Sequence, residues 1–256
     1  MSITGIDDAK RRFSSRVADY LRYRPAYPSA VVDWLRGAAA FAAGSHVVDL
    51  GSGTGLLARV FLDAGARVTG VEPNASMRRA GARELADYPR WRCIDGSAEA
   101  TGLAGSCADL VVSGQAFHWF DPDAARDECL RILRGAPRAA MIWNERHLEG
   151  AFMHEYEQLL LEFAPDYEKI TASHVDETML GRFFGGRSWR RHETPNTQVL
   201  DYAGLEGRLM SSSYAPPRGS RDGDVITARL ERLFDRHACD GAVVFPYRTI
   251  VIFGAL

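Results

Sequence analysis

The sequence has few cysteines, and their spacing is not typical of a metal site or a disulfide framework. The four cysteines stand at positions 93, 107, 129 and 239, and no two of them form a Cys-x-x-Cys pair. Neither a zinc site nor a set of disulfides is therefore indicated. We expect free thiols and no metal ion, as in a protein of the reducing cytoplasm.

Long apolar runs and a strong net charge are also missing. No run of 18 apolar residues occurs, and residues 1–15 lack the apolar core of a signal peptide, so we expect a cytoplasmic protein without a membrane span. The 31 Lys and Arg nearly balance the 33 Asp and Glu, which gives a net charge of −2. This balance argues against a nucleic-acid partner.

The motifs of several enzyme classes are absent as well. The sequence contains neither GxSxG, the nucleophile motif of many hydrolases, nor GxxxxGK[ST], the phosphate-binding loop of many nucleotidases. His154 and Glu155 begin an HExxH pattern, but Gln158 stands where the second histidine would be needed. Zinc-peptidase chemistry is therefore not indicated.

What the sequence does contain is a regular alternation of strand-like and helical segments. Short strand-like segments occur at 46–50, 67–71, 90–94, 108–113 and 138–144, several of them apolar and β-branched, with helical patterns between them. Such an alternation is typical of an α/β fold with a parallel sheet that helices cover on both faces.

The ends of the chain follow other patterns. Helices are expected at 7–22 and 28–43, separated by an extended segment that two prolines impose. After residue 144 we expect one clear helix, then a strand at 188–200, helices at 204–213 and 224–237, and a final strand or strand pair at 242–254. Pro246 argues against a central position for that last strand at that point.

A glycine-rich loop at residues 47–55, VVDLGSGTG, joins the first strand of this alternation to a helix. Glycines at 51, 53 and 55 let the backbone approach a ligand and point N–H groups at it. The dinucleotide fingerprint GxGxxG would need a glycine at position 56, where Leu56 stands. Asp49 is also poorly placed beside a pyrophosphate. The loop therefore favours a ligand with an ammonium or sulfonium group.

An acidic residue follows the second strand. Glu72 stands 21 positions after Gly51 (72 − 51), where a carboxylate can accept hydrogen bonds from both ribose hydroxyls. This position indicates a nucleoside, without distinguishing one cofactor from another.

On these motifs the chain resembles the class I S-adenosylmethionine-dependent methyltransferases. Residues 49–55 are similar to the first motif of that family and residues 71–74 to its second. Further similarity is to a type 11, small-molecule subgroup that includes trans-aconitate methyltransferase-like proteins, over residues 13–28, 96–103, 108–121, 141–147 and 205–216. The resemblance implies a seven-stranded, Rossmann-like, mostly parallel sheet with one antiparallel strand near the C-terminus. It also implies S-adenosylmethionine as cofactor and S-adenosylhomocysteine as product.

The resemblance implies one domain over residues 1–256, in four sections. They are a helical cap (1–44), a cofactor-binding core (45–144), a helical lid insertion (145–187), and strands and helices that complete the sheet (188–256).

The resemblance also implies a set of cofactor-binding residues. These are Asp49, Gly51, Ser52, Gly53, Gly55, Glu72, Pro73, Asn74, Met77, Ser97, Ala98, Gln115, Tyr20 and Arg24. Gly51 would approach the methionine part of the cofactor, Glu72 the ribose, and residues 97–98 the adenine. Many relatives carry an aspartate at the position of Ser97, so Asp95 is an alternative contact.

Two of these assignments have structural alternatives. Asn74 and Met77 border the adenine in one interpretation, and in the other they are a helix N-cap and ordinary helix packing. Arg24 or Tyr23 lies near the cofactor carboxylate or an acidic substrate if the N-terminal segment folds over the cofactor. Otherwise Arg24 lies on the surface.

The substrate pocket is expected at the carboxyl ends of the fourth and fifth strands, because these ends face the crevice in open α/β sheets. Its predicted residues are Phe117, His118, Trp119, Trp143 and Asn144, with Arg146 or His147 as further candidates. Methyl transfer needs mainly alignment. His118 is a candidate general base, which a hydroxyl acceptor often requires and a carboxylate does not, or part of the pocket wall.

The sequence thus predicts methyl transfer to a small-molecule acceptor, with a carboxylate or hydroxyl oxygen favoured. Two alternatives stay open: a nicotinamide-dependent oxidoreductase, against which Leu56 and Asp49 count, and a non-catalytic S-adenosylmethionine-binding regulatory protein. The oligomeric state is left open.

Overall fold

The computed structural model describes residues 22–38, 40–164, 167, 177–212 and 214–256. The helix expected at 7–22 therefore lies almost wholly outside the described residues, and Tyr20 lies outside them.

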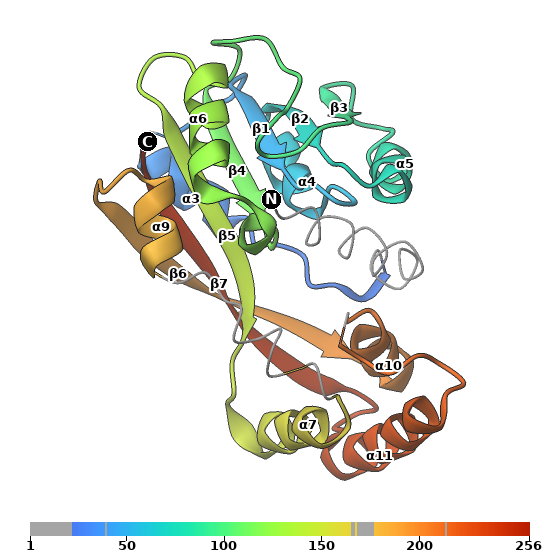
Figure 1. Ribbon diagram of the computed structural model, residues 1–256. Helices are drawn as coiled ribbons and strands as arrows, with labels where there is room; N and C mark the ends of the chain where they lie inside the picture. Colours follow the sequence, from blue (N-terminus) through green and yellow to red (C-terminus); the bar gives the residue numbers. More distant parts are fainter. Residues whose placement is uncertain (1–21, 39, 165–166, 168–176, 213) are drawn as a thin grey trace.

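Seven strands form a single mixed sheet in the order β3-β2-β1-β4-β5-β7-β6 (Figure 1). They are β1 (His46–Leu50), β2 (Arg67–Val71), β3 (Trp91–Ile94), β4 (Leu110–Gly114), β5 (Arg138–Arg146), β6 (Trp189–Leu200) and β7 (Val243–Ala255). The first five strands pair in parallel, and β7 is antiparallel to both β5 and β6. The predicted fold class, with one antiparallel strand near the C-terminus, is confirmed.

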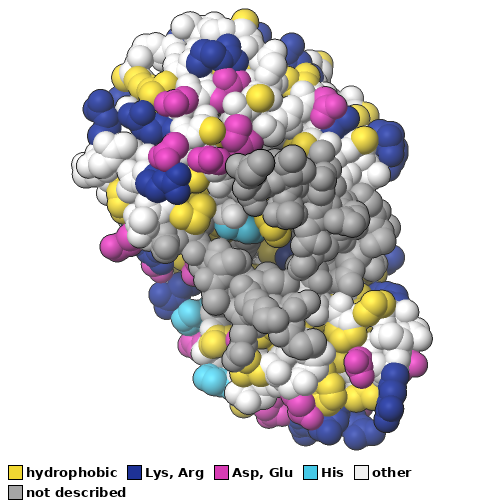
Figure 2. Space-filling model, in the orientation of Figure 1, with side chains coloured by type: hydrophobic (Ala, Val, Ile, Leu, Met, Phe, Trp, Pro, Cys, Tyr) yellow, Lys and Arg dark blue, Asp and Glu magenta, His cyan; other side chains and the backbone are white. Residues whose placement is uncertain are grey.

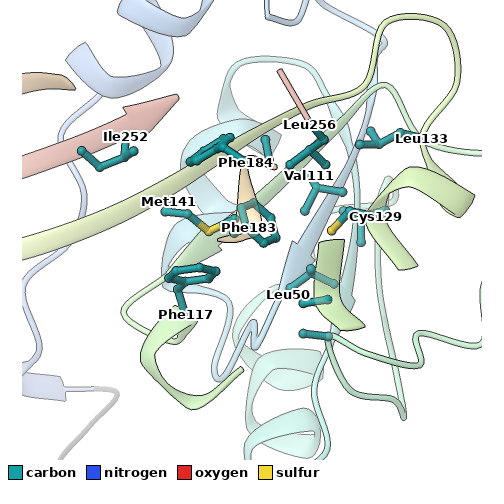
Figure 3. Close-up of a cluster of buried hydrophobic side chains, with 14 of the residues drawn as sticks. Leu50, Val111, Phe117, Cys129, Leu133, Met141, Phe183, Phe184, Ile252 and Leu256 are labelled. Carbon is teal, nitrogen blue, oxygen red and sulfur yellow. The ribbon is translucent and has the colours of Figure 1, made fainter. Parts of the chain in front are cut away.

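Helices cover both faces of the sheet. On one face, α3 (Ala30–Gly37) and α4 (Leu56–Asp63) bury Leu35 and Phe61 against the sheet. On the other, α6 (Pro122–Ile132) and α9 (Glu177–Phe183) bury Cys129 and Phe183 beside Met141 (Figure 3). Covering both faces explains the uninterrupted apolar strands, since all five residues of β1 are buried. Helix α5 (Ala75–Glu84) lies beside β3.

Three further helices pack at the far end of the longest strands. They are α7 (Gly150–Phe163), α10 (Tyr202–Met210) and α11 (Arg221–His237), and we call them the distal helical group (Figure 1). Their shared core includes Tyr156, Leu205 and Leu230, together with Phe245 from the first half of β7. The long strands β6 and β7 therefore connect two hydrophobic cores.

The helices after β5 pack against other partners than the sequence predicted. Of the predicted lid at 145–187, α7 joins the distal helical group, whereas α9 covers the sheet through Leu180 and Phe183. Helices α10 and α11 were expected to complete the sheet, but they pack with α7 instead. Local apolar patterns do not show which partner an apolar face will meet, because that depends on contacts distant in the sequence.

Residues 243–255 form one long strand inside the sheet. Its pairing with β5 begins at Tyr247, which lies opposite Arg146, and Pro246 pairs with Thr197 of β6. On the other side the carbonyl of Pro246 accepts a hydrogen bond from the N–H of His147, just after β5, at 3.0 Å. Because only its carbonyl is used there, the missing backbone N–H of the proline removes no ladder bond to β5. Pro246 thus lies at the point where the ladder with β5 ends.

Two surface properties bear on function. On the face shown in Figure 2, the Lys and Arg side chains are interspersed with Asp and Glu side chains among the described residues. No helix in the described part of the chain is both long and apolar enough to cross a membrane.

Candidate functional site

The glycine loop after β1 adopts left-handed backbone at its three glycines. The φ angles are +67° at Gly51, +55° at Gly53 and +83° at Gly55, a region that favours glycine. A Cβ on Gly51 would lie 2.6 Å from the Cβ of Ala116, whereas one on Gly53 would meet nothing within 4 Å. Gly55 is the N-cap of α4 and packs against Leu85. It therefore has a structural role at the start of this helix, and its predicted cofactor contact stays a prediction.

Glu72 connects this loop to the loop after β2. Its Oε2 accepts a hydrogen bond from the N–H of Gly53 at 2.9 Å, and its Oε1 accepts one from the N–H of Asn74 at 2.7 Å. Asn74 is the N-cap of α5, since its Oδ1 accepts from the N–H groups of Ser76 and Met77. Asn74 therefore has the capping role that was the structural alternative.

The loop after β3 was predicted to lie beside the adenine. Ser97 forms a tight turn with Ala100, with N···O distances of 3.1 and 3.3 Å, and Ala98 is buried in the sheet core. Asp95 is exposed and pairs with Arg78 at 2.8 Å. The predicted cofactor residues that do not line the main pocket are Gly55, Glu72, Pro73, Asn74, Met77, Ser97 and Ala98.

The main pocket lies where the carboxyl ends of β1, β4 and β5 meet the distal helical group, and its volume is about 410 Å³. The sequence-predicted residues that line it are Arg24, Asp49, Gly51, Ser52, Gly53, Gln115, His118, Trp119, Trp143, Asn144 and Arg146. The residues in its wall that the sequence did not single out include Tyr27, Thr54, Glu157, Tyr167, Arg208 and Tyr214. His147 is not part of the wall.

Asp49 is a buried carboxylate at the sheet side of this pocket. It is 1% exposed, and no cationic side chain of the described residues pairs with its carboxylate. Burial, together with repulsion from Glu72, raises the pKa of Asp49 well above its ordinary value. The hydroxyl of Thr54 is likewise buried without a partner among the described residues. A cationic ligand would supply the missing countercharge, so this part of the pocket fits the ammonium or sulfonium of S-adenosylmethionine.

The extended segment at 22–28 contributes Arg24 to the pocket wall. Its backbone carbonyls accept hydrogen bonds from side-chain amides of the sheet: Gln198 donates to Tyr23 at 3.1 Å, and Asn196 to residue 26 at 2.8 Å. Asn144 adds longer bonds to residues 25 and 26. Arg24 itself donates from Nη2 to the carbonyl of Ser211 at 2.9 Å. Arg24 therefore lines the pocket and also connects this segment to the end of α10.

Asn144 lines the pocket, and its side-chain amide also forms hydrogen bonds with the neighbouring strands. Its Oδ1 accepts hydrogen bonds from Thr249 at 2.5 Å and from Asn196 at 3.1 Å. Its backbone carbonyl accepts one from Gln115 at 2.9 Å. Gln115 has a left-handed φ of +57°, a strained conformation that such contacts must hold in place.

The aromatic segment after β4 divides between core and pocket. Phe117 is fully buried, with ring-to-ring distances of 5.0 Å to Phe183 and 6.5 Å to Trp143 (Figure 3). The prediction that Phe117 lines the substrate pocket is wrong. The single 3-10 turn Phe117–Trp119 directs Phe117 into the core, while His118 and Trp119 line the pocket with their rings 4.8 Å apart.

A sequence signal for one missed pocket residue does exist. Arg208 lies on the buried face of α10, three residues after Leu205 and directly before Leu209, both of which are fully buried. A charged residue on an apolar helix face is unusual and often has a functional reason. Tyr214 lies in an irregular segment and carries no comparable signal.

Comparisons with known proteins agree with this geometry. Residues 48–138 match a methyltransferase domain family. Over 253 residues, 97% of each chain, the protein is 28% identical to an uncharacterized methyltransferase of Mycobacterium tuberculosis. It is 32% identical over 151 residues, 59% of each chain, to another of Schizosaccharomyces pombe.

Solved structures share the fold at lower identity. A chain from Anaeromyxobacter dehalogenans, assigned to the type II methyltransferases, has a TM-score of 0.67 and 21% identity, with 91% of this chain and 98% of that chain covered. A phosphoethanolamine N-methyltransferase of Haemonchus contortus, in complex with phosphomonomethylethanolamine and S-adenosylhomocysteine, has a TM-score of 0.59 and 12% identity, with coverage of 99% and 60%.

The matched domain and the relatives indicate a methyltransferase that uses S-adenosylmethionine, and they count against the nicotinamide alternative. The domain covers the glycine loop, Glu72 and the strands that form the sheet side of the pocket. Residues 48–138 of the chain are thus similar to the methyltransferase domain family, and the fold is similar to that of solved methyltransferase structures.

Proposed function

We propose that this enzyme methylates an oxygen nucleophile, a carboxylate or a hydroxyl, of a small molecule bound in the main pocket. The observation that carries the proposal is that one cavity is lined both by the buried Asp49 with its glycine loop and by His118 with polar groups of the distal helical group. Its volume of about 410 Å³ lies in the range usual for small-molecule sites.

The sheet side of the pocket would hold the cofactor, which supplies a methyl group already activated on a sulfonium. Asp49 would provide the countercharge, and the backbone of the glycine loop would approach the methionine part. Glu72, held by the N–H groups of Gly53 and Asn74, would turn toward the ribose. The chain then contributes chiefly alignment and the exclusion of water.

The acceptor would lie against His118, Trp119 and Trp143. The two indoles offer apolar surface, and His118 can accept a proton from a hydroxyl acceptor. The fold accommodates acceptors of this size, since the Haemonchus contortus structure contains phosphomonomethylethanolamine. The mixed charges on the face shown in Figure 2 and the four free cysteines support a cytoplasmic enzyme without a nucleic-acid partner.

Two measurements test the proposal. Calorimetry with S-adenosylhomocysteine is expected to give one binding site per chain. Label from methyl-labelled S-adenosylmethionine is expected to appear in at least one compound of a panel of carboxylic acids and alcohols. A folded protein that does not bind S-adenosylhomocysteine would overturn the cofactor assignment. Binding without label transfer to any panel compound would favour the non-catalytic alternative.

Replacing Arg24 by alanine is expected to weaken the binding of S-adenosylhomocysteine or raise the KM for the acceptor by about 10-fold or more. The reason is that a hydrogen bond to a charged group contributes about 1.5–3 kcal/mol. Calorimetry and initial-rate kinetics measure both quantities. Arg22, exposed and two residues earlier, gives the control Arg22→Ala. Unchanged affinity and turnover in Arg24→Ala would place Arg24 outside the site.

Replacing His118 by glutamine separates its two proposed roles. With a hydroxyl acceptor, kcat is expected to fall by about 10²- to 10⁴-fold, the usual contribution of a general base. With a carboxylate acceptor, kcat should change only a few-fold, since no proton has to leave. Affinity for S-adenosylhomocysteine serves as the control and should stay near the wild-type value. If kcat fell only slightly with every hydroxyl acceptor, His118 would be part of the pocket wall and not a general base.

A further inference from the structure

Arg208 is a buried cation in the wall of the main pocket. The residue is 5% exposed, its Nε donates to the hydroxyl of Tyr247 at 2.8 Å, and its Nη1 donates to the hydroxyl of Ser212 at 3.1 Å. The rings of Phe245 and Tyr247 lie 5.8 Å from the guanidinium carbon. All of these partners are neutral side chains.

No carboxylate of the described residues forms an ion pair with Arg208. An arginine stays charged at any physiological pH, and burying a charge without a counter-ion is costly. Its Nη2 makes no hydrogen bond to a described residue, and the guanidinium borders the cavity. The missing negative charge can therefore come from a ligand in the pocket.

Arg146 adds a second guanidinium to the same wall. It donates from Nη1 to the hydroxyl of Tyr214 at 3.2 Å and from Nη2 to the hydroxyl of Tyr167, and it pairs with Glu157 at 3.3 Å. Glu157 thus balances one of the two arginines. The pair Arg146 and Arg208 keeps an excess of positive charge around Tyr214.

The pKa of Tyr214 reflects the positive charge of the surrounding arginines. Burial raises the pKa of its hydroxyl, but Arg146 and Arg208, with a hydrogen bond to Ser212 and the charge of Arg24, outweigh that effect, so the pKa lies below its ordinary value. Behind them, the hydroxyl of Tyr156 is fully buried without a hydrogen-bond partner among the described residues. This part of the pocket therefore has donors and positive charge in excess of its acceptors.

We propose that Arg208, Arg146 and Tyr214 form an anion-binding subsite that holds a compact oxyanionic group, a carboxylate or a phosphate, of the methyl acceptor. The subsite belongs to the distal helical group and the end of β5, whereas Asp49 and the glycine loop belong to the sheet. The anionic group it holds is distinct from the atom that receives the methyl group. This inference rests on the proposed function and narrows the acceptors to acids that carry a second nucleophile.

The subsite can be tested without turnover. Wild-type protein saturated with S-adenosylhomocysteine is titrated calorimetrically with citrate and, separately, with inorganic phosphate. We expect at least one of these anions to bind, Arg208→Met to weaken that binding by at least 10-fold, and Tyr214→Phe to weaken it by a few-fold. The control Arg236→Met removes an exposed arginine of α11 and should bind the anions as the wild type does. The stronger of the two probes identifies the kind of oxyanion.

Affinity for S-adenosylhomocysteine distinguishes this subsite from a cofactor contact. It should change less than about two-fold in Arg208→Met, and an equal loss of cofactor affinity would overturn the proposal by assigning Arg208 to the cofactor carboxylate. Absence of anion binding by the wild type, or equal binding by Arg208→Met, would also overturn it. If Arg208→Met does not fold, Tyr214→Phe and Arg208→Lys decide the question. A protein that binds neither anion but still transfers methyl groups would refute only this inference.

Discussion

Replacing Asp49 by asparagine is expected to lower the affinity for S-adenosylmethionine and S-adenosylhomocysteine by about 10- to 100-fold, while the ligand-free protein becomes more stable. The carboxylate is buried, lines the pocket and has no cationic partner among the described residues. An ion in that environment costs free energy in the empty protein, and a cationic ligand recovers it. A charge-assisted contact of this kind contributes about 1.5–3 kcal/mol.

The stability gain of Asp49→Asn should depend on pH in one direction. The pKa of Asp49 is raised in the folded state, above its ordinary value of 3.8. Between these two pKa values, Asp49 keeps its proton in the folded protein and has lost it in the unfolded chain. The free energy of unfolding of the wild type therefore falls as the pH rises through that interval. The asparagine variant lacks this contribution, so its advantage should grow above about pH 4 and become constant above the raised pKa.

Denaturant unfolding between pH 4 and 8, with calorimetry at neutral pH, measures both effects. Asp235→Asn is the matched control, because that carboxylate is exposed on α11 and lies outside the pocket wall. It should change neither cofactor affinity nor stability by more than about 1 kcal/mol. A wild-type affinity in Asp49→Asn would show that the carboxylate does not face the cofactor.

The sheet and the cofactor loop could be predicted because their signals are local. The strands β1, β2 and β4 are short segments rich in valine, and the left-handed angles at Gly51, Gly53 and Gly55 occur within the glycine-rich loop. Asn74 likewise caps the helix that follows it, as a short polar side chain before a helix commonly does.

The acceptor side of the pocket could not be predicted in the same way. Arg146, Arg208 and Tyr214 come from segments up to 68 residues apart, and only the pairing of β5, β6 and β7 brings them together. The direction of Phe117 depends on one 3-10 turn, in which neighbouring aromatic residues point to opposite sides. Composition indicates an aromatic cluster there, but it does not indicate which ring faces the core.

Replacing Phe117 by alanine is expected to lower the free energy of unfolding by about 3–5 kcal/mol, the usual cost of removing a fully buried phenylalanine ring. The ring packs against Phe120, Trp143 and Phe183, so the deletion leaves a cavity that these large rings cannot easily fill. Since a domain of this kind has a total stability of about 5–15 kcal/mol, the loss is a large fraction of it. Denaturant unfolding measures the change.

Trp119→Ala is the matched comparison, because Trp119 lies two residues later in the same turn and is partly exposed in the pocket wall. It should cost about 1 kcal/mol of stability or less, yet lower kcat/KM for the acceptor by about 10-fold through the loss of an apolar contact. Phe117→Ala should show the reverse pattern, a large loss of stability with little loss of function. Below its melting temperature it should bind S-adenosylhomocysteine almost normally. If Phe117→Ala kept wild-type stability but lost turnover, the ring would act on the ligand. The division of the aromatic segment into a core side and a pocket side would then be wrong.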